Sequence, residues 1–108
     1  MNQENKFEVI FCIVNHGFTD VVMEAAKKNG ARGGTIMNAR GTATEETEKF
    51  YGIAITPEKE IVMIIVEHEK KDSIMKAIYD EAGLSSLGQG IVFSLPISHV
   101  AGMNIEEK

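Results

Sequence analysis

The chain has 108 residues, of which 44% are hydrophobic and 25% are charged, and its formal net charge at pH 7 is −5. This length is sufficient for one domain, residues 1–108, with a real hydrophobic core. The negative charge and the lack of a basic stripe argue against a nucleic-acid-binding role. The single cysteine, Cys12, excludes a disulfide within the chain. No signal-peptide pattern and no membrane-length apolar run is seen, so we expect a cytoplasmic protein.

The first half predicts a strand, a helix and a second strand. Residues 7–14 are apolar with the spacing of a strand, and residues 19–28 carry apolar positions at helical spacing. Gly30 is placed to end that helix. Residues 35–39 form the second predicted strand, and the polar segment 42–50 is predicted to be a loop.

The second half repeats this order. We predict strands at 51–55, 61–66 and 91–95, and a helix that begins near Asp72 or Ser73 and ends before Gly83. The segment Thr56–Lys59 is expected to break the chain between two of these strands. The order β-α-β-β-α-β predicts an α+β, ferredoxin-like sandwich with an antiparallel sheet and both helices on one face. We expect the first and third strands to be central neighbours that run parallel to each other.

Both faces of the two central strands are apolar. Residues 9–14 and 61–66 alternate across the sheet, and neither face carries a charged side chain. Two helices cover only one face, and the other would expose a large apolar patch that monomers avoid. The sequence therefore predicts a homo-oligomer whose sheets pack against one another.

Two loops have the composition of an anion site. Gly88-Gln89-Gly90 leads directly into the last strand, and Arg40-Gly41-Thr42 follows the second strand. Glycines let backbone N–H groups approach an anion closely, although the same residues are also common in plain turns.

Several segments, taken in order, resemble the P-II nitrogen regulatory protein family. They are Ala31–Ile36, Ala39–Gly41, Pro57–Lys59 before the strand 61–66, and Leu87–Phe93. The resemblance extends over about residues 6 to 103.

The resemblance implies a homotrimeric signalling protein. The sequence shows no set of nucleophile, base and orienting group, so we expect a protein that is not an enzyme and that requires no cofactor or metal. The resemblance implies that an adenine nucleotide, ATP or ADP, or a related anion binds between subunits. It also implies that the loop 42–50 contacts a protein target, such as a membrane transporter or a regulatory enzyme, through Thr44, Glu45, Glu46 and Glu48. The implied ligand-binding residues are Thr35, Arg40, Gly41, Thr42, Leu87, Gly88, Gln89 and Gly90.

The chain departs from the family pattern at several cationic positions. Ile91 stands where the family has a lysine after the last glycine of the phosphate loop, and Gln89 replaces an acidic residue. The C-terminal arginines of the family are absent from Ser98–Met103. A charge-assisted contact to phosphate contributes about 1.5–3 kcal/mol, so the loss of two lowers the expected nucleotide affinity by about two to four decades.

Two other functions fit the same element order. One is a trimeric divalent-metal-binding protein of the CutA type, which requires His16 and His68 to approach each other at the ends of parallel strands. The other is an isomerase or oxygenase of the ferredoxin-like barrel kind, which requires a deep pocket between sheet and helices. That pocket would be excluded if Phe11, Ile65 and Phe93 filled the space.

Overall fold

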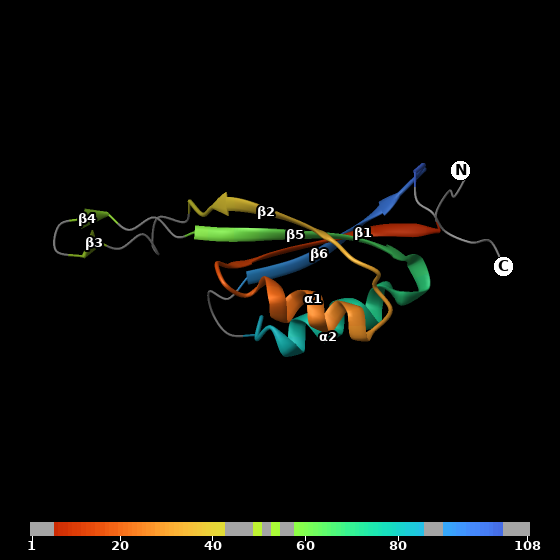
Figure 1. The fold of residues 1–108 in the computed structure, drawn as a ribbon, viewed down its shortest axis with the longest axis horizontal. Coiled ribbons are helices and arrows are strands. Elements are labelled where there is room, and N and C mark those ends of the chain that lie inside the picture. The colour runs from red at the N-terminus through yellow and green to blue at the C-terminus, as the bar shows by residue number, and fades with distance from the viewer. Residues whose placement is uncertain (1–5, 43–48, 51–52, 55–57, 86–89, 103–108) are drawn as a thin grey trace.

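The computed structural model describes residues 6–42, 49–50, 53–54, 58–85 and 90–102. Four strands form one sheet in the order β2-β5-β1-β6, and every neighbouring pair is antiparallel. Both helices cover the same face of this sheet (Figure 1). The α+β, ferredoxin-like fold expected from the sequence is confirmed. Its elements are β1 (Phe7–Asn15), α1 (Thr19–Lys28), β2 (Thr35–Arg40), β5 (Glu58–Glu67), α2 (Lys71–Glu81) and β6 (Gly90–Ile97).

The predicted direction of the two central strands was wrong. β1 and β5 are neighbours but run antiparallel, with Phe7 opposite Glu67 and Asn15 opposite Lys59. The helix α1 connects β1 to β2, and β5 lies between these two strands and is antiparallel to each. The right-handed crossover rule therefore applies to β1 and β2, which are not adjacent, and not to β1 and β5.

The hydrophobic core lies between the sheet and the helices. Alternate residues of the two central strands are buried there, and they pack against the inner faces of α1 and α2. Phe11, Ile65 and Phe93 do not fill this space, since their positions in the strands place them on the opposite face. The layer is filled instead by Ile10, Cys12, Val14, Val22, Ala25, Ala26, Val62, Ile64, Val66, Ile74 and Ile78.

Cys12 is fully buried in this core. Burial penalises the thiolate and raises the pKa of the Cys12 thiol from 9.0 to about 12. The residue is therefore a small apolar side chain in the packing, as its apolar sequence context indicated, and a poor nucleophile at neutral pH.

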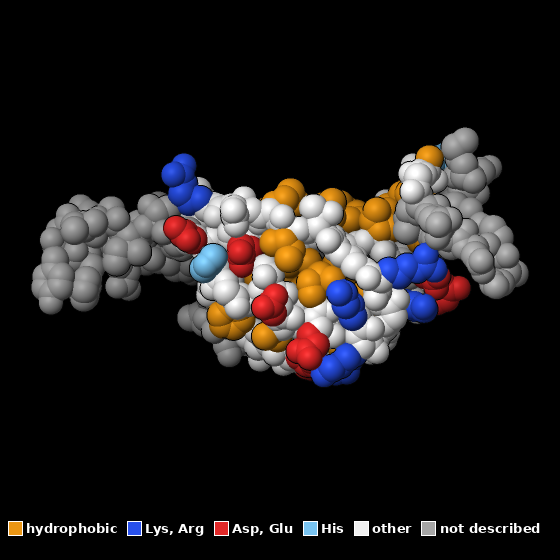
Figure 2. All heavy atoms as spheres, viewed as in Figure 1, with side chains coloured by type: hydrophobic (Ala, Val, Ile, Leu, Met, Phe, Trp, Pro, Cys, Tyr) orange, Lys and Arg blue, Asp and Glu red, His pale blue; other side chains and the backbone are white. Residues whose placement is uncertain are grey.

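The second face of the sheet carries apolar side chains and no helix. The rings of Phe11 and Phe93 stack there with their centroids 5.4 Å apart. Ile91 and Leu95 flank Phe93 on β6 and are 57% and 49% exposed. Figure 2 shows hydrophobic side chains along the upper side of the molecule, above the sheet and away from the helices. The two-faced pattern of the sequence thus corresponds to one buried and one uncovered apolar face in the single chain.

One buried carboxylate lies at the end of the sheet where β1 begins and β5 ends. The Glu8 side chain is 8% exposed, and its Oε2 is 2.6 Å from Nδ1 of His68 and 3.9 Å from Nζ of Lys71. The backbone N–H of His68 also donates to the carbonyl oxygen of Lys6, at 2.8 Å. These contacts hold the short 3-10 helix His68–Lys70 against the start of β1.

The chain between β2 and β5 contains a small second sheet. Lys49–Phe50 (β3) pairs with Ile53–Ala54 (β4), beyond the end of the main sheet where β2 finishes (Figure 1). The predicted loop 42–50 therefore includes a short strand at its end, and the predicted strand 51–55 is observed at Ile53–Ala54. The break expected at Thr56–Lys59 is shorter than predicted, because β5 already begins at Glu58.

Candidate functional site

An open pocket of about 500 Å³ lies where β2 ends and β5 begins. The ends of β2 and β5 form two of its walls, and the segment that follows β1 forms the third. Opposed strand ends leave such a depression because the sheet stops there while the connecting segments continue outward. The lining residues are His16, Asn38, Ala39, Arg40, Glu58 and Lys59.

Hydrogen bonds fix the walls of this pocket to one another. The backbone N–H of His16 donates to the carbonyl oxygen of Glu58, at 3.1 Å. The N–H of Gly17 donates to Oε1 of Glu60, at 3.1 Å, and Nδ1 of His16 is 3.5 Å from the other oxygen of that carboxylate. The segment after β1 is therefore held on the first residues of β5 by both backbone and side-chain contacts.

Lys59 is engaged within the sheet. Its ammonium donates to Oδ1 of Asn15, at 2.7 Å, and these two residues are directly opposite each other on β5 and β1. A cation that already forms a short hydrogen bond of this kind is less available to bind a ligand than a cation without one.

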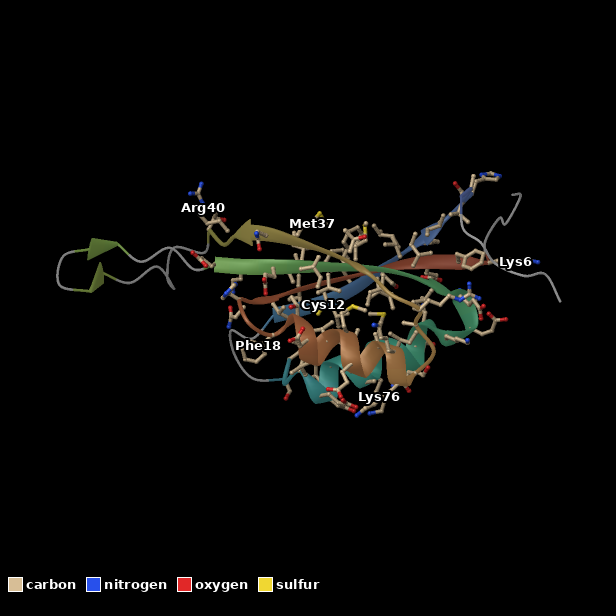
Figure 3. All side chains as sticks on the ribbon, in the orientation of Figure 1. Lys6, Cys12, Phe18, Met37, Arg40 and Lys76 are labelled. Atoms are coloured by element: carbon tan, nitrogen blue, oxygen red, sulfur yellow. The ribbon has the colours of Figure 1, made fainter. Side chains whose placement is uncertain are left out.

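Arg40 and Glu58 are the charged groups that remain available. They are opposite each other on β2 and β5, and both are exposed. Figure 3 shows Arg40 at the end of β2, with its side chain directed away from the helices. Within the parts of the chain that the structure describes, neither residue forms an ion pair. Glu45 and Glu46, the acidic residues that follow Arg40 most closely in the sequence, lie outside the described ranges.

Gly90 is required by the sheet itself. Its φ of +146° lies in a region that side chains rarely adopt, and a Cβ atom here would collide with the carbonyl oxygen of Ile13. The sequence suggested that this glycine lets an anion approach the backbone. The packing of β6 on β1 accounts for it without any ligand.

The predicted ligand-binding residues fall in three places. Arg40 lies in the pocket, with Gly41 and Thr42 directly after it. Thr35 is at the other end of β2, about 17 Å away along the strand. Leu87, Gly88 and Gln89 lie outside the described residues, as do Thr44, Glu45, Glu46 and Glu48 of the predicted partner loop.

Gly90 and the end of β2 are at the same end of the sheet but on opposite edges. Gly90 of β6 is opposite Val14, Val14 is opposite Glu60, and Glu60 is opposite Asn38 of β2. Three strand spacings, about 14 Å, therefore separate the first residue of β6 from the end of β2 within one chain.

The histidine pair proposed as a metal site does not form. His16 follows the end of β1 and His68 follows the end of β5, and these antiparallel strands end at opposite sides of the molecule. In this register ten residues separate the two histidines along β5, which corresponds to about 33 Å along the sheet. Among the described residues, no group of three or more His, Cys, Asp or Glu side chains is arranged to hold a metal ion.

Sequence reasoning missed five lining residues of the pocket: His16 in this role, Asn38, Ala39, Glu58 and Lys59. The signal that could have found them is the register of β2 on β5. The break near Pro57 marks the point where the chain returns to the sheet, and pairing Arg40 with the next residue, Glu58, would have placed these side chains around one depression.

The comparison with known proteins matches the chain to one family. The model of the family described as "Nitrogen regulatory protein P-II" matches residues 7–107. The chain belongs to the P-II family. This confirms the resemblance found in the sequence, and the P-II family consists of regulatory rather than catalytic proteins.

A curated plant relative and a solved plant structure illustrate the relationship. The chain is 27% identical over 111 residues to a nitrogen regulatory protein P-II homolog of Arabidopsis thaliana, and the match covers 97% of this chain and 57% of that protein. The chain thus spans little more than half the length of this P-II relative. The crystal structure of Arabidopsis thaliana PII bound to citrate is similar with a TM-score of 0.69 and 26% identity, over 87% of this chain and 79% of that one.

Among the described residues, no helix is long and apolar enough to cross a membrane.

Proposed function

We propose that this P-II family member is a homotrimeric signalling protein that senses a small metabolite between its subunits. The observation that carries the proposal is the position of Gly90 relative to Arg40. They lie at one end of the sheet but on opposite edges, so one ligand would contact both only where the β2 edge of one copy approaches the β6 edge of another. This strand order supports a site shared between copies.

The uncovered apolar face supports self-association. Phe93, Ile91 and Leu95 are each more than one third exposed in the single chain. Each large apolar side chain that is removed from water contributes about 1.5–3 kcal/mol, so a face with several of them strongly favours packing against a second copy. The trimer implied by the family places these faces inside the assembly.

The ligand we propose is an adenine nucleotide, ATP or ADP, or a related anion, and no bound cofactor is required. Arg40, Gly41 and Thr42 would form one wall, and Leu87 to Gly90 of a neighbouring copy the other. Arg40 is suited to this role because its guanidinium forms no ion pair with any described residue.

The output of the protein is a contact with a partner. We propose that the segment 42–50 reports the state of the site to a membrane transporter or a regulatory enzyme in the cytoplasm. This segment begins two residues after Arg40, so a ligand that orders Arg40 acts close to the first residues of the loop. A regulatory role without catalysis is consistent with the P-II family.

Two measurements on the purified full chain test this function. Light scattering after size exclusion gives the mass of the assembly, for which we expect three copies. Titration calorimetry with ATP, with ADP and with citrate then gives affinity and stoichiometry, for which we expect one nucleotide per chain. A monomer that binds none of the three anions at millimolar concentration contradicts the proposal.

A further inference from the structure

The lining of the pocket beside Arg40 carries charges of both signs. Arg40 and Lys59 are cationic, and Glu58 is anionic. A carboxylate beside a guanidinium suits a ligand that itself carries both signs of charge. Figure 2 shows basic, acidic and histidine side chains gathered at this end of the molecule.

Among the described residues that line the pocket, one group of each sign forms no ion pair. Lys59 donates to Asn15, and the Glu60 carboxylate accepts from the N–H of Gly17. Arg40 and Glu58 form no ion pair within the described part of the chain, although their backbones are directly opposite each other. Their Cα atoms are therefore about 5 Å apart.

The spacing suits the two charged groups of one small molecule. A guanidinium binds a carboxylate in a bidentate manner, and a carboxylate accepts hydrogen bonds from an ammonium group. An α-amino acid carries a carboxylate and an ammonium on one carbon atom, which matches two oppositely charged side chains on adjacent strands. The whole pocket has a volume of about 500 Å³, which leaves room for the side chain of the bound amino acid.

A metal ion is a weaker explanation for the free carboxylate. Glu58 would need further oxygen or nitrogen ligands, and no group of three acidic, histidine or cysteine side chains is arranged for this among the described residues. The neighbouring guanidinium also repels a cation but complements a carboxylate.

We propose that the pocket at the end of β2 binds a free α-amino acid, with Arg40 holding the carboxylate and Glu58 the ammonium group. This proposal rests on the effector role proposed above for this end of the sheet, and it adds the chemical class of one effector. It is independent of the glycine loop, because Arg40 and Glu58 come from the same chain and the same strand pair.

Titration of the full-length protein with the twenty standard L-amino acids tests the proposal. We expect at least one to bind, with one molecule per chain. The 2-oxo acid and the decarboxylated amine of the best binder serve as probes that lack one charge each, and both should bind at least about tenfold more weakly. Arg40→Gln and Glu58→Gln should each lower the affinity of the amino acid by a similar factor.

Two further variants test whether the binding of the amino acid depends on the charge of Glu58 in particular. Glu58→Lys should reverse the preference, so that the 2-oxo acid binds more tightly than the amino acid. Lys76→Gln, in the exposed Lys76–Asp80 pair of α2, should leave the affinity unchanged. Circular dichroism of each variant shows whether it is folded.

The outcomes separate this proposal from the function proposed above. If ATP or ADP binds and no amino acid binds up to about 10 mM, the amino-acid site is refuted while the nucleotide sensor stands. If an amino acid binds and no nucleotide does, the nucleotide ligand is refuted instead. Equal binding of amino acid and 2-oxo acid, or binding that is unaffected by Glu58→Gln, also overturns the role of Glu58.

Discussion

Gly90 and Ile13 approach so closely that a methyl group on Gly90 would overlap the carbonyl oxygen of Ile13. The contact joins the first residue of β6 to β1 and sets how the last strand enters the sheet. Because the neighbouring atom is a backbone oxygen in a central strand, it cannot move away without loss of the pairing between β1 and β6.

Gly90→Ala should therefore destabilise the protein by about 2 kcal/mol or more, from the unfavourable φ and the collision together. Urea unfolding at fixed protein concentration measures the change. Gly33→Ala is the matched control, since its Cβ would meet no atom within 4 Å and its φ is not positive. Equal stability of the two variants would show that Gly90 is not a packing requirement.

The buried thiol gives a pH-dependent prediction. The pKa of Cys12 is raised to about 12 in the folded chain, so below pH 9 the thiol is protonated in both the folded and the unfolded state and contributes no pH dependence. Between pH 9 and 12 the unfolded state loses the proton and the folded state keeps it. Stability should then fall by about 1.4 kcal/mol per pH unit because of this residue.

Urea unfolding of the native chain and of Cys12→Ala from pH 7 to 10.5 measures this effect. The steeper slope above pH 9 should be present only in the native chain, and alkylation of Cys12 at pH 8 should require unfolding. Fast alkylation of the folded protein would contradict the burial of this thiol.

The uncovered face of the sheet predicts an effect of Phe93→Asp on assembly. A charge beside Phe11, on this largely apolar face, would be buried on association, at a cost of several kcal/mol per copy. The variant should run as a smaller species in size exclusion with light scattering. Tyr79→Asp is the control, because Tyr79 is an exposed aromatic on α2, in the helical layer. An unchanged mass for Phe93→Asp would place the subunit contact elsewhere.

The buried Glu8 predicts a measurable coupling to His68. A double-mutant cycle with Glu8→Gln and His68→Gln should give a coupling energy of about 1 kcal/mol, because Glu8 is buried while His68 is 60% exposed and screened by water. Thermal or urea unfolding of the four proteins supplies the values. Additive effects of the two substitutions would mean that the 2.6 Å contact does not stabilise the fold.

The sequence was informative about the positions of helices and strands, and less so about which face of each strand is buried. Strand and helix positions followed from apolar spacing and from Gly30 and Gly83, which have positive φ values of 107° and 70°. The choice of inner face did not follow, since Ile64 and Ile65 are equally apolar and only Ile64 lies under the helices. The alternation of residues along a strand identifies its two faces, but it does not show which face is buried under the helices when both are hydrophobic.

The candidate site was predicted in part for a similar reason. Arg40 was identified from its place at the end of a strand, whereas Glu58 was assigned to a break in the chain. The importance of Glu58 depends on its register opposite Arg40, which a single sequence does not specify. The distance between His16 and His68 depended in turn on strand direction, and that prediction was wrong.

The chain leaves the main sheet at Arg40 and returns at Glu58, and these two residues are paired. The ends of segment 41–57 are therefore already closed by the sheet, at the separation that a tight hairpin turn also spans. We expect that replacing 41–57 with Asn-Gly would leave the four-stranded sheet intact. Arg40 and Glu58 would remain in such a shortened protein, so we expect the amino acid proposed for this pair still to bind, while the segment proposed to contact a partner would be missing.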